Sequence, residues 1–175
     1  MATHQISILG ANTVPDTSGK VWQEPYSILA TNDVWPFLIF RISEAGANNA
    51  ALTTRVGIYG QFVVPQNYVG TAAIVIVWTA TVTTGNKVFD FDYRAIGGDD
   101  AESLDQTSNS ESVSVTDAAP SAAHERNIPS VNLTSANLAA GDTVEFFACE
   151  DGTDAADTHA GDAILVDVLF QYADA

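Results

Sequence analysis

The sequence predicts an all-β fold, an antiparallel two-sheet β-sandwich with a jelly-roll-like arrangement of strands. Apolar residues alternate with polar ones over many short segments, and this period of two is typical of strands with one buried face. No segment sustains the i, i+3, i+4, i+7 spacing of an amphipathic helix. Roughly eight to ten such segments, punctuated by turn residues, favour a sandwich or jelly roll.

The first 35 residues are expected to form an N-terminal arm or edge segment. They combine prolines and aromatic residues with little clear strand pattern, which suits a segment that orders against a neighbour. Ile6 and Ile8 share one face of a short strand, and Pro25 interrupts a second apolar stretch. In chain order, the predicted elements are a strand at 4–9, a turn at 15–19 and a strand at 22–30.

Residues 36–175 are expected to form the sandwich, within a single domain overall. The segment 73–83 is apolar on both sides at its start, as in a central strand between two layers. A short hairpin connection at 84–86 is predicted to join it to a strand at 88–94. The inward positions of that strand are Phe89, Phe91 and Tyr93. The other predicted elements are strands at 37–42, 56–64, 112–116, 127–133, 142–149 and 163–172, and one helical turn at 134–138.

The composition is strongly acidic, with 22 Asp and Glu residues, 6 Lys and Arg residues and a formal charge of −16. Such a surface repels nucleic acids and anionic membranes, whose phosphates bind clustered Lys and Arg. The N-terminus lacks the basic start and apolar run of a signal peptide, and the most apolar stretch is too short to span a membrane. We therefore expect a soluble protein, made in a cytoplasm, with neither nucleic acid nor membrane as a partner.

No catalytic signature is present, since the sequence lacks a Gly-x-Ser-x-Gly elbow, a His-Glu-x-x-His motif and a Gly-rich phosphate loop. His4, His124 and His159 lie near a terminus or in polar segments, where we expect them to be solvated. Cys149 lies in an apolar strand and is expected to be a buried, inert thiol. These observations predict a protein that is not an enzyme and that has no catalytic or cofactor-binding residues.

The segment 150–162 concentrates five acidic residues into 13 positions. Such a loop could hold calcium, which takes six to eight oxygen ligands. Its spacing, however, does not match the Asp-x-Asp-x-Asp-Gly calcium loop. We therefore expect a solvated hairpin connection whose Asp and Gly residues satisfy their own turn, with no metal site.

Three tryptophans and three arginines are candidate contact residues. Trp78 lies in an apolar strand and is expected in the core, whereas Trp22 and Trp35 flank polar sequence. If exposed, the latter two would suit a sugar or an interface; the alternative is a half-buried position at a sheet edge. The scarce arginines in or beside strands are expected to pair with acids on neighbouring strands, or across a subunit interface; they are Arg41, Arg55 and Arg94.

Two stretches in about the last 100 residues resemble a known family. One runs through residues 75–80 and Gly85 into Phe89-Asp90-Phe91-Asp92-Tyr93-Arg94-Ala95-Ile96-Gly97. The other comprises 137–146, 151–154, 157–158 and, at its end, Phe170-Gln171-Tyr172. These stretches resemble small β-sandwich virion proteins of tailed, marine-type bacteriophages, which are often capsid decoration (cement) proteins and commonly trimeric. The resemblance supplies no functional residues.

The resemblance implies a structural virion protein. We therefore predict a capsid decoration protein that stabilises the phage head at the capsid surface, with itself as a homotrimer and the major capsid protein as partners. The alternative is a carbohydrate- or receptor-binding module of a phage tail or head fibre, for which an exposed Trp22 or Trp35 would be the first sign. The third class, a hydrolase with two carboxylates, is disfavoured by the missing catalytic signatures.

Overall fold

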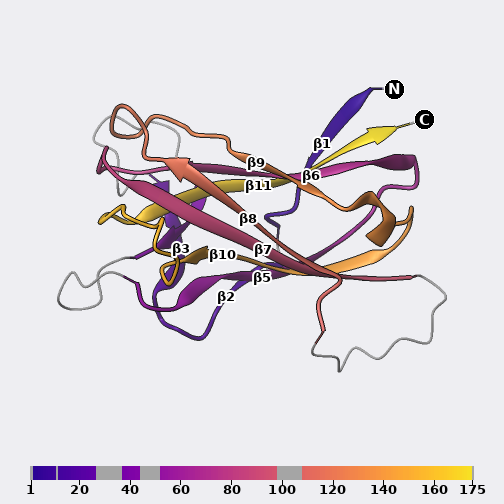
Figure 1. The fold of residues 1–175 in the computed structure, drawn as a ribbon, viewed down its shortest axis with the longest axis horizontal. Helices are drawn as coiled ribbons and strands as arrows, with labels where there is room; N and C mark the ends of the chain where they lie inside the picture. The colour runs from indigo at the N-terminus through magenta and orange to yellow at the C-terminus, as the bar shows by residue number, and fades with distance from the viewer. Residues whose placement is uncertain (1, 11, 27–36, 44–51, 98–107, 175) are drawn as a thin grey trace.

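The computed structural model describes residues 2–10, 12–26, 37–43, 52–97 and 108–174, which form two antiparallel sheets (Figure 1). The predicted all-β, two-sheet fold is therefore confirmed. The strands are β1 (Thr3–Ser7), β2 (Val14–Pro15), β3 (Val21–Pro25), β4 (Leu38–Ile42), β5 (Arg55–Val63), β6 (Tyr68–Thr79), β7 (Asn86–Ile96), β8 (Glu111–Ala118), β9 (Ser130–Leu133), β10 (Thr143–Asp151) and β11 (Ala163–Asp174).

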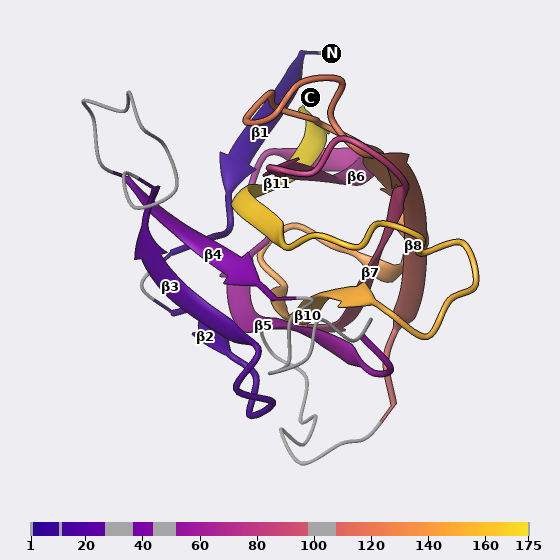
Figure 2. The ribbon, with the colours of Figure 1, turned by 90° about the vertical axis from the view of Figure 1, so that its left-hand side faces the viewer.

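The two sheets lie on opposite sides of one core. Sheet A has the strand order β3-β4-β11-β6-β9, and β1 pairs with the C-terminal half of β11. Sheet B has the order β2-β5-β10-β7-β8. Figure 2 shows β6 and β11 on one side of the core and β5 and β10 on the other. Within the described ranges, no helix has the length and apolarity that crossing a lipid bilayer requires.

Alternate positions of both sheets supply the core, as the period of two predicts. The inward positions Phe89, Phe91 and Tyr93 of β7 are all buried. Trp78 of β6 is fully buried, as expected, and its ring meets that of Phe89 across the core with centroids 5.2 Å apart. Each such side chain contributes roughly 1.5–3 kcal/mol by its burial, so this two-sided packing holds the sheets together.

Most consecutive strands lie in different sheets, and this corrects the predicted hairpin at 84–86. β6 belongs to sheet A and β7 to sheet B, so the chain crosses between the sheets there. The connection from β10 to β11 crosses in the same way, so it is not the expected hairpin either. The alternation of apolar residues shows which side chains face inward but not which strand lies alongside, because pairing joins residues that are distant in sequence.

β6 begins earlier than the predicted residue 73. Gly70 and Thr71 both have positive φ angles, 115° and 51°, and the paired strand β11 shifts register nearby, between Tyr172 and Asp174. This irregularity breaks the alternation, which is why the pattern starts only after it.

The predicted helical turn at 134–138 is a single 3₁₀ turn, η2 (Ser135–Asn137).

The described part of the N-terminal segment 1–35 forms β1, β2 and β3, which lie at sheet edges. β1 lies beside the C-terminus (Figure 1), where the backbone N–H of Ala2 donates to Asp174 Oδ1 at 2.8 Å. β3 ends at Pro25, and the predicted strand residues 27–30 lie outside the described residues. The same holds for the predicted boundary at residue 35, so the division into arm and sandwich stays a prediction.

One carboxylate ties sheet B to sheet A along the β8–β9 side. Glu111 accepts hydrogen bonds from the backbone N–H of Thr134 at 2.9 Å, from its hydroxyl at 2.7 Å, and from the Tyr93 hydroxyl at 2.8 Å. Burial raises the pKa of Glu111, but these hydrogen bonds outweigh burial and lower the pKa below 4.5. The ionised carboxylate therefore contributes stability above its unfolded pKa, and this stability is lost as the pH falls through the folded pKa.

We expect Glu111→Gln to lower the free energy of unfolding at pH 7 by about 1–2 kcal/mol, because hydrogen bonds to a charged acceptor become bonds to a neutral one. The difference from wild type should shrink below pH 4.5, where wild type loses the same contribution. Urea unfolding of wild type and Glu111→Gln at pH 7, 5 and 3.5 measures this difference in the free energy of unfolding. A difference that does not depend on pH would contradict this account.

Candidate functional site

The outer face of sheet B, which points away from sheet A, carries the candidate site. The strand register places five outward side chains in one row across the sheet, one from each strand. The row is apolar on β2, β5 and β10 and polar on β7 and β8. Its members are Val14, Tyr59, Phe147, Asp92 and Ser112.

An aromatic pair, Tyr59 and Phe147, occupies the middle of this row. The two residues are cross-strand neighbours, and their rings stack with centroids 4.4 Å apart at an interplanar angle of 22°. Tyr59 is 49% exposed, Phe147 is half-buried, and the exposed Val14 lies next to Tyr59. A stacked aromatic pair left in solvent on a sheet offers an apolar surface to a ligand.

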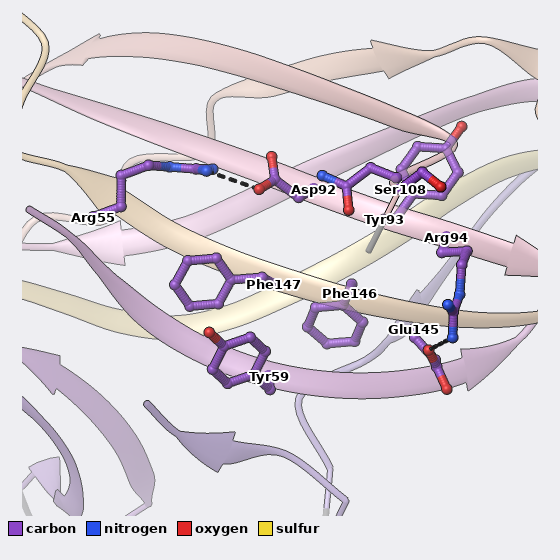
Figure 3. Close-up of a pocket in the computed structure, with 10 residues that line it drawn as sticks. Arg55, Tyr59, Asp92, Tyr93, Arg94, Ser108, Glu145, Phe146 and Phe147 are labelled. Atoms are coloured by element: carbon purple, nitrogen blue, oxygen red, sulfur yellow. Dashed lines mark hydrogen bonds and ion pairs between the residues drawn. The ribbon is translucent and has the colours of Figure 1, made fainter. Parts of the chain in front are cut away.

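Arg55 lies on one side of the aromatic pair (Figure 3). It reaches over β10 to β7, where its Nε lies 3.0 Å from Asp90 Oδ2 and its Nη1 donates to Asp92 Oδ2 at 2.8 Å. Its guanidinium carbon also lies 5.7 Å from the centre of the Phe147 ring, a cation–π distance. The hydrogen bond with Asp92 raises the pKa of Arg55, so this cation stays charged.

Carboxylates crowd around Arg55. Burial raises the pKa of Asp90, and the charges of Asp151 and Asp92 add to this effect, although a hydrogen bond from Ser114 and the charge of Arg55 oppose it. The Oδ1 atom of Asp92 is buried and accepts no hydrogen bond from the residues that the structure describes. Negative charge is therefore in excess on this side of the site.

A second ion pair lies on the other side of the aromatic pair. Arg94 Nη2 donates to Glu145 Oε2 at 2.5 Å across β7 and β10 (Figure 3). The Glu145 side chain is 37% exposed, whereas that of Arg94 is largely buried. Ser108 and Asn109, just before β8, add a hydroxyl and an amide to the same side.

Two adjoining hollows cross the strands on this face. The first has a volume of about 400 Å³ and lies between the Arg55 and Arg94 ion pairs. The second, of about 510 Å³, lies toward β2 beside Asn12 and Gln61. Tyr59 and Glu145 line both hollows, and both volumes are in the range of roughly 300–1,000 Å³ typical of ligand sites.

The floor of the site depends on a close approach of β5 to β10. A Cβ atom at Gly57 would lie 2.1 Å from the Ala148 carbonyl oxygen and 2.5 Å from Cys149 Cα, so any other residue would push the strands apart. Cys149 itself is buried, as predicted, and burial raises the pKa of its thiol while Arg55 opposes this. The thiol therefore stays protonated at neutral pH.

The tryptophans lie elsewhere. Trp22 is half-buried on the edge strand β3, where its indole N–H donates to Glu24 Oε2 at 2.8 Å. The guanidinium carbon of Arg41 lies over the Trp22 ring, 5.4 Å from the ring centre. Trp22 therefore matches the alternative prediction, a half-buried position at a sheet edge. Trp35 lies outside the described residues. Arg41 also pairs with Asp162, its Nε 2.6 Å from Oδ2, so each of the three predicted arginines contacts acids of this chain.

The histidines are only partly as expected. His124 is exposed and its Nδ1 lies 2.8 Å from the Tyr26 hydroxyl, while His4 is half-exposed beside Asp174. The expectation of a solvated His159 was wrong, because its side chain is 2% exposed and its Nδ1 lies 2.7 Å from the Thr84 carbonyl oxygen. The crossing from β10 to β11 folds this polar segment over one end of the core.

The acidic segment 150–162 divides into two parts. Asp151 Oδ1 accepts from the Thr153 N–H at 2.9 Å, so this side chain satisfies its own turn as predicted. Glu150 instead points inward and contacts the ammonium of Lys87, and both side chains are fully buried. Asp157 Oδ1 lies 3.8 Å from the same ammonium. In the described part of the chain, no group of three or more His, Cys, Asp and Glu residues is placed to hold a metal.

Sequence reasoning missed Tyr59 and Phe147. A signal was present, because both are aromatic residues on the side of an alternating strand where polar residues are expected. The sequence alone does not reveal the site from this signal. Two such residues form one surface only if their strands are neighbours and the register places the residues opposite each other. That pairing, and the position of Arg55 above it, appears only in the folded chain.

No family model matches the chain, and a search of curated proteins finds no match in sequence. Solved structures do match in fold. A family 35 carbohydrate binding module from Clostridium thermocellum covers 99% of this chain and 99% of its own, with a TM-score of 0.52 at 13% identity. The CBM22-1 xylan-binding domain from Paenibacillus barcinonensis covers 98% of this chain and 94% of its own, with a TM-score of 0.50 at 9% identity.

A CBM35 from Paenibacillus barcinonensis covers 96% of both chains, with a TM-score of 0.50 at 8% identity. At such identities these likenesses establish the fold alone. The chain is a β-sandwich of the architecture that these carbohydrate-binding modules share. The three neighbours carry the names of binding modules rather than of catalytic domains.

The buried Lys87–Glu150 pair makes a testable contribution to stability. Lys87→Met leaves the carboxylate of Glu150 buried, so we expect the free energy of unfolding to fall by about 3–5 kcal/mol. The double variant Lys87→Met, Glu150→Leu should recover part of this loss, because the charge of Glu150 is removed together with that of Lys87, while the nearby carboxylate of Asp157 remains. Lys20→Met, at the other lysine of the sequence, is the control and should change stability by less than about 0.5 kcal/mol. Urea unfolding measures all three, and a single variant as stable as wild type would refute the argument.

Proposed function

We propose that this domain binds carbohydrate on the outer face of sheet B. The observation that carries the proposal is the stacked pair of the exposed Tyr59 and the half-buried Phe147 in a groove across the strands. A sugar ring has apolar C–H faces and a rim of hydroxyls. It therefore suits an aromatic surface bordered by hydrogen-bonding side chains, which here are those of Arg55, Arg94 and Glu145.

The fold supports this proposal but does not carry it. One structural neighbour is described as xylan-binding, and others as carbohydrate-binding modules. One fold hosts many functions, so the residues of the site carry the functional inference. The proposed role is one of binding without catalysis. The two carboxylates that line the groove, Asp92 and Glu145, each accept a hydrogen bond from an arginine of this chain.

The capsid decoration role predicted from the sequence stays a second proposal, with the homotrimer, the major capsid protein and the virion surface as its parts. Exposed apolar side chains outside the groove favour contacts with other proteins, namely Leu38 at 60% and Ile128 at 57% exposure. Light scattering and binding to expanded phage capsids test this proposal. A strictly monomeric protein that ignores such capsids would exclude it.

Removing the aromatic pair tests the carbohydrate proposal. A glycan array identifies a ligand for the wild-type domain, and isothermal titration calorimetry then measures its Kd. We expect Tyr59→Ala and Phe147→Ala each to raise Kd about tenfold or more, a loss of about 1.4 kcal/mol. Trp22→Ala removes an aromatic ring from the other sheet and should leave Kd unchanged. Unaltered binding by Tyr59→Ala would count against this site, and an array without ligands would count against the function.

Affinity should also depend on the length of the glycan. Because Tyr59 lies between the two hollows, a short ligand fills one of them and a longer ligand contacts both. We therefore expect Kd to fall from the disaccharide to the hexasaccharide of a bound glycan, and Gln61→Ala to weaken only the longer ligands. Equal affinity for all lengths would mean that the second hollow takes no part.

A further inference from the structure

We infer that the glycan bound by this site is uncharged, and that the site discriminates against glycans that carry carboxylate or sulfate groups. This inference rests on the proposed carbohydrate-binding function and adds the chemical class of the ligand. It follows from how the charges of the site are paired, from the kind of uncharged groups that line it, and from the charge of the whole chain.

The cations of the site are already engaged. Arg55 faces both Asp90 and Asp92, and Arg94 faces Glu145. An anionic ligand would have to compete with these carboxylates for the two guanidinium groups. A site built to bind carboxylate or sulfate would instead present an arginine fork toward the ligand.

Carboxylates outnumber guanidinium groups around the aromatic pair. Asp151 lies opposite Arg55 in the register, so this arginine has three carboxylates about it. Asp92 Oδ1 accepts no hydrogen bond from the described residues, so part of its charge is not compensated by a donor there. The raised pKa of Asp90, caused first by burial and then by its acidic neighbours, agrees with this excess of negative charge. A further anion placed here would be repelled.

The other polar groups that the groove offers to a ligand are amides and hydroxyls. Amides and hydroxyls both donate and accept hydrogen bonds, as sugar hydroxyls do, whereas a carboxylate or sulfate only accepts. A neutral sugar can therefore donate to Glu145 and exchange hydrogen bonds with these groups. They are the side chains of Asn12, Gln61, Ser108 and Asn109 and the hydroxyl of Tyr59.

The charge of the whole chain acts in the same direction. A formal charge of −16 gives a field that disfavours the approach of anionic polymers, in addition to the contacts within the site. This long-range part is screened by salt, while the contacts within the groove are screened less. Salt and local charge variants can therefore separate the two effects.

Matched oligosaccharides that differ only at C6 test the inference. The probes are the β-1,4-linked hexamers of mannose and of glucose, and the corresponding hexamers of mannuronic and glucuronic acid. Whichever backbone binds, we expect the neutral hexamer to bind at least tenfold more tightly than the acidic one in 150 mM salt. Acidic hexamers that bind equally well or better would overturn the inference and leave the proposed function intact. A glycan array without any ligand would instead refute the proposed function.

A local charge variant tests the cause. Glu145→Gln removes one negative charge from the groove, and we expect it to tighten binding of the acidic hexamer about threefold to fivefold. Asp154→Asn makes the same change in net charge, in a turn outside the residues that line the groove, and is the matched control. Equal effects of the two variants would assign the discrimination to the overall charge and overturn the role of the groove. Circular dichroism checks that both variants fold.

Discussion

The burial of one face of each sheet is the constraint on which the rest of this structure depends. Inward positions such as Val56, Ile58 and Phe146 are committed to the core, and the pleat then turns their neighbours outward. Tyr59 and Phe147 cannot rotate into the interior without exposing that core. The outward position of both rings is thus a consequence of core packing.

The register of β5 and β10 then brings the outward-facing rings of Tyr59 and Phe147 together in one site. The backbones of β5 and β10 approach closely at Gly57, and the register of these two strands places Tyr59 opposite Phe147. The same alignment brings Arg55 within reach of two carboxylates on β7, a strand with which β5 is not paired. One register of the strands therefore supplies both the aromatic pair and the ion pairs of Arg55.

Scarce cations in an acidic chain are placed where they compensate buried or crowded carboxylates. Lys87 faces Glu150 inside the core, while Arg41, Arg55 and Arg94 face acids at the surfaces of the sheets. Each pair joins segments that are far apart in sequence, so the ion pairs add to the specificity of the arrangement. Their use within the fold also leaves the face of sheet B with few cations for an external anion.

The sequence by itself determined most of the strands and their inward faces, because alternation is a local pattern that burial imposes on each strand separately. It also indicated that Trp78 is in the core, that Cys149 is buried, and that the arginines pair with acids. Only the tertiary structure decided that β6 and β7 lie in different sheets, that His159 is buried, and that Tyr59 meets Phe147. These features depend on which strands become neighbours, and neighbours are chosen by contacts between distant residues that no local pattern records.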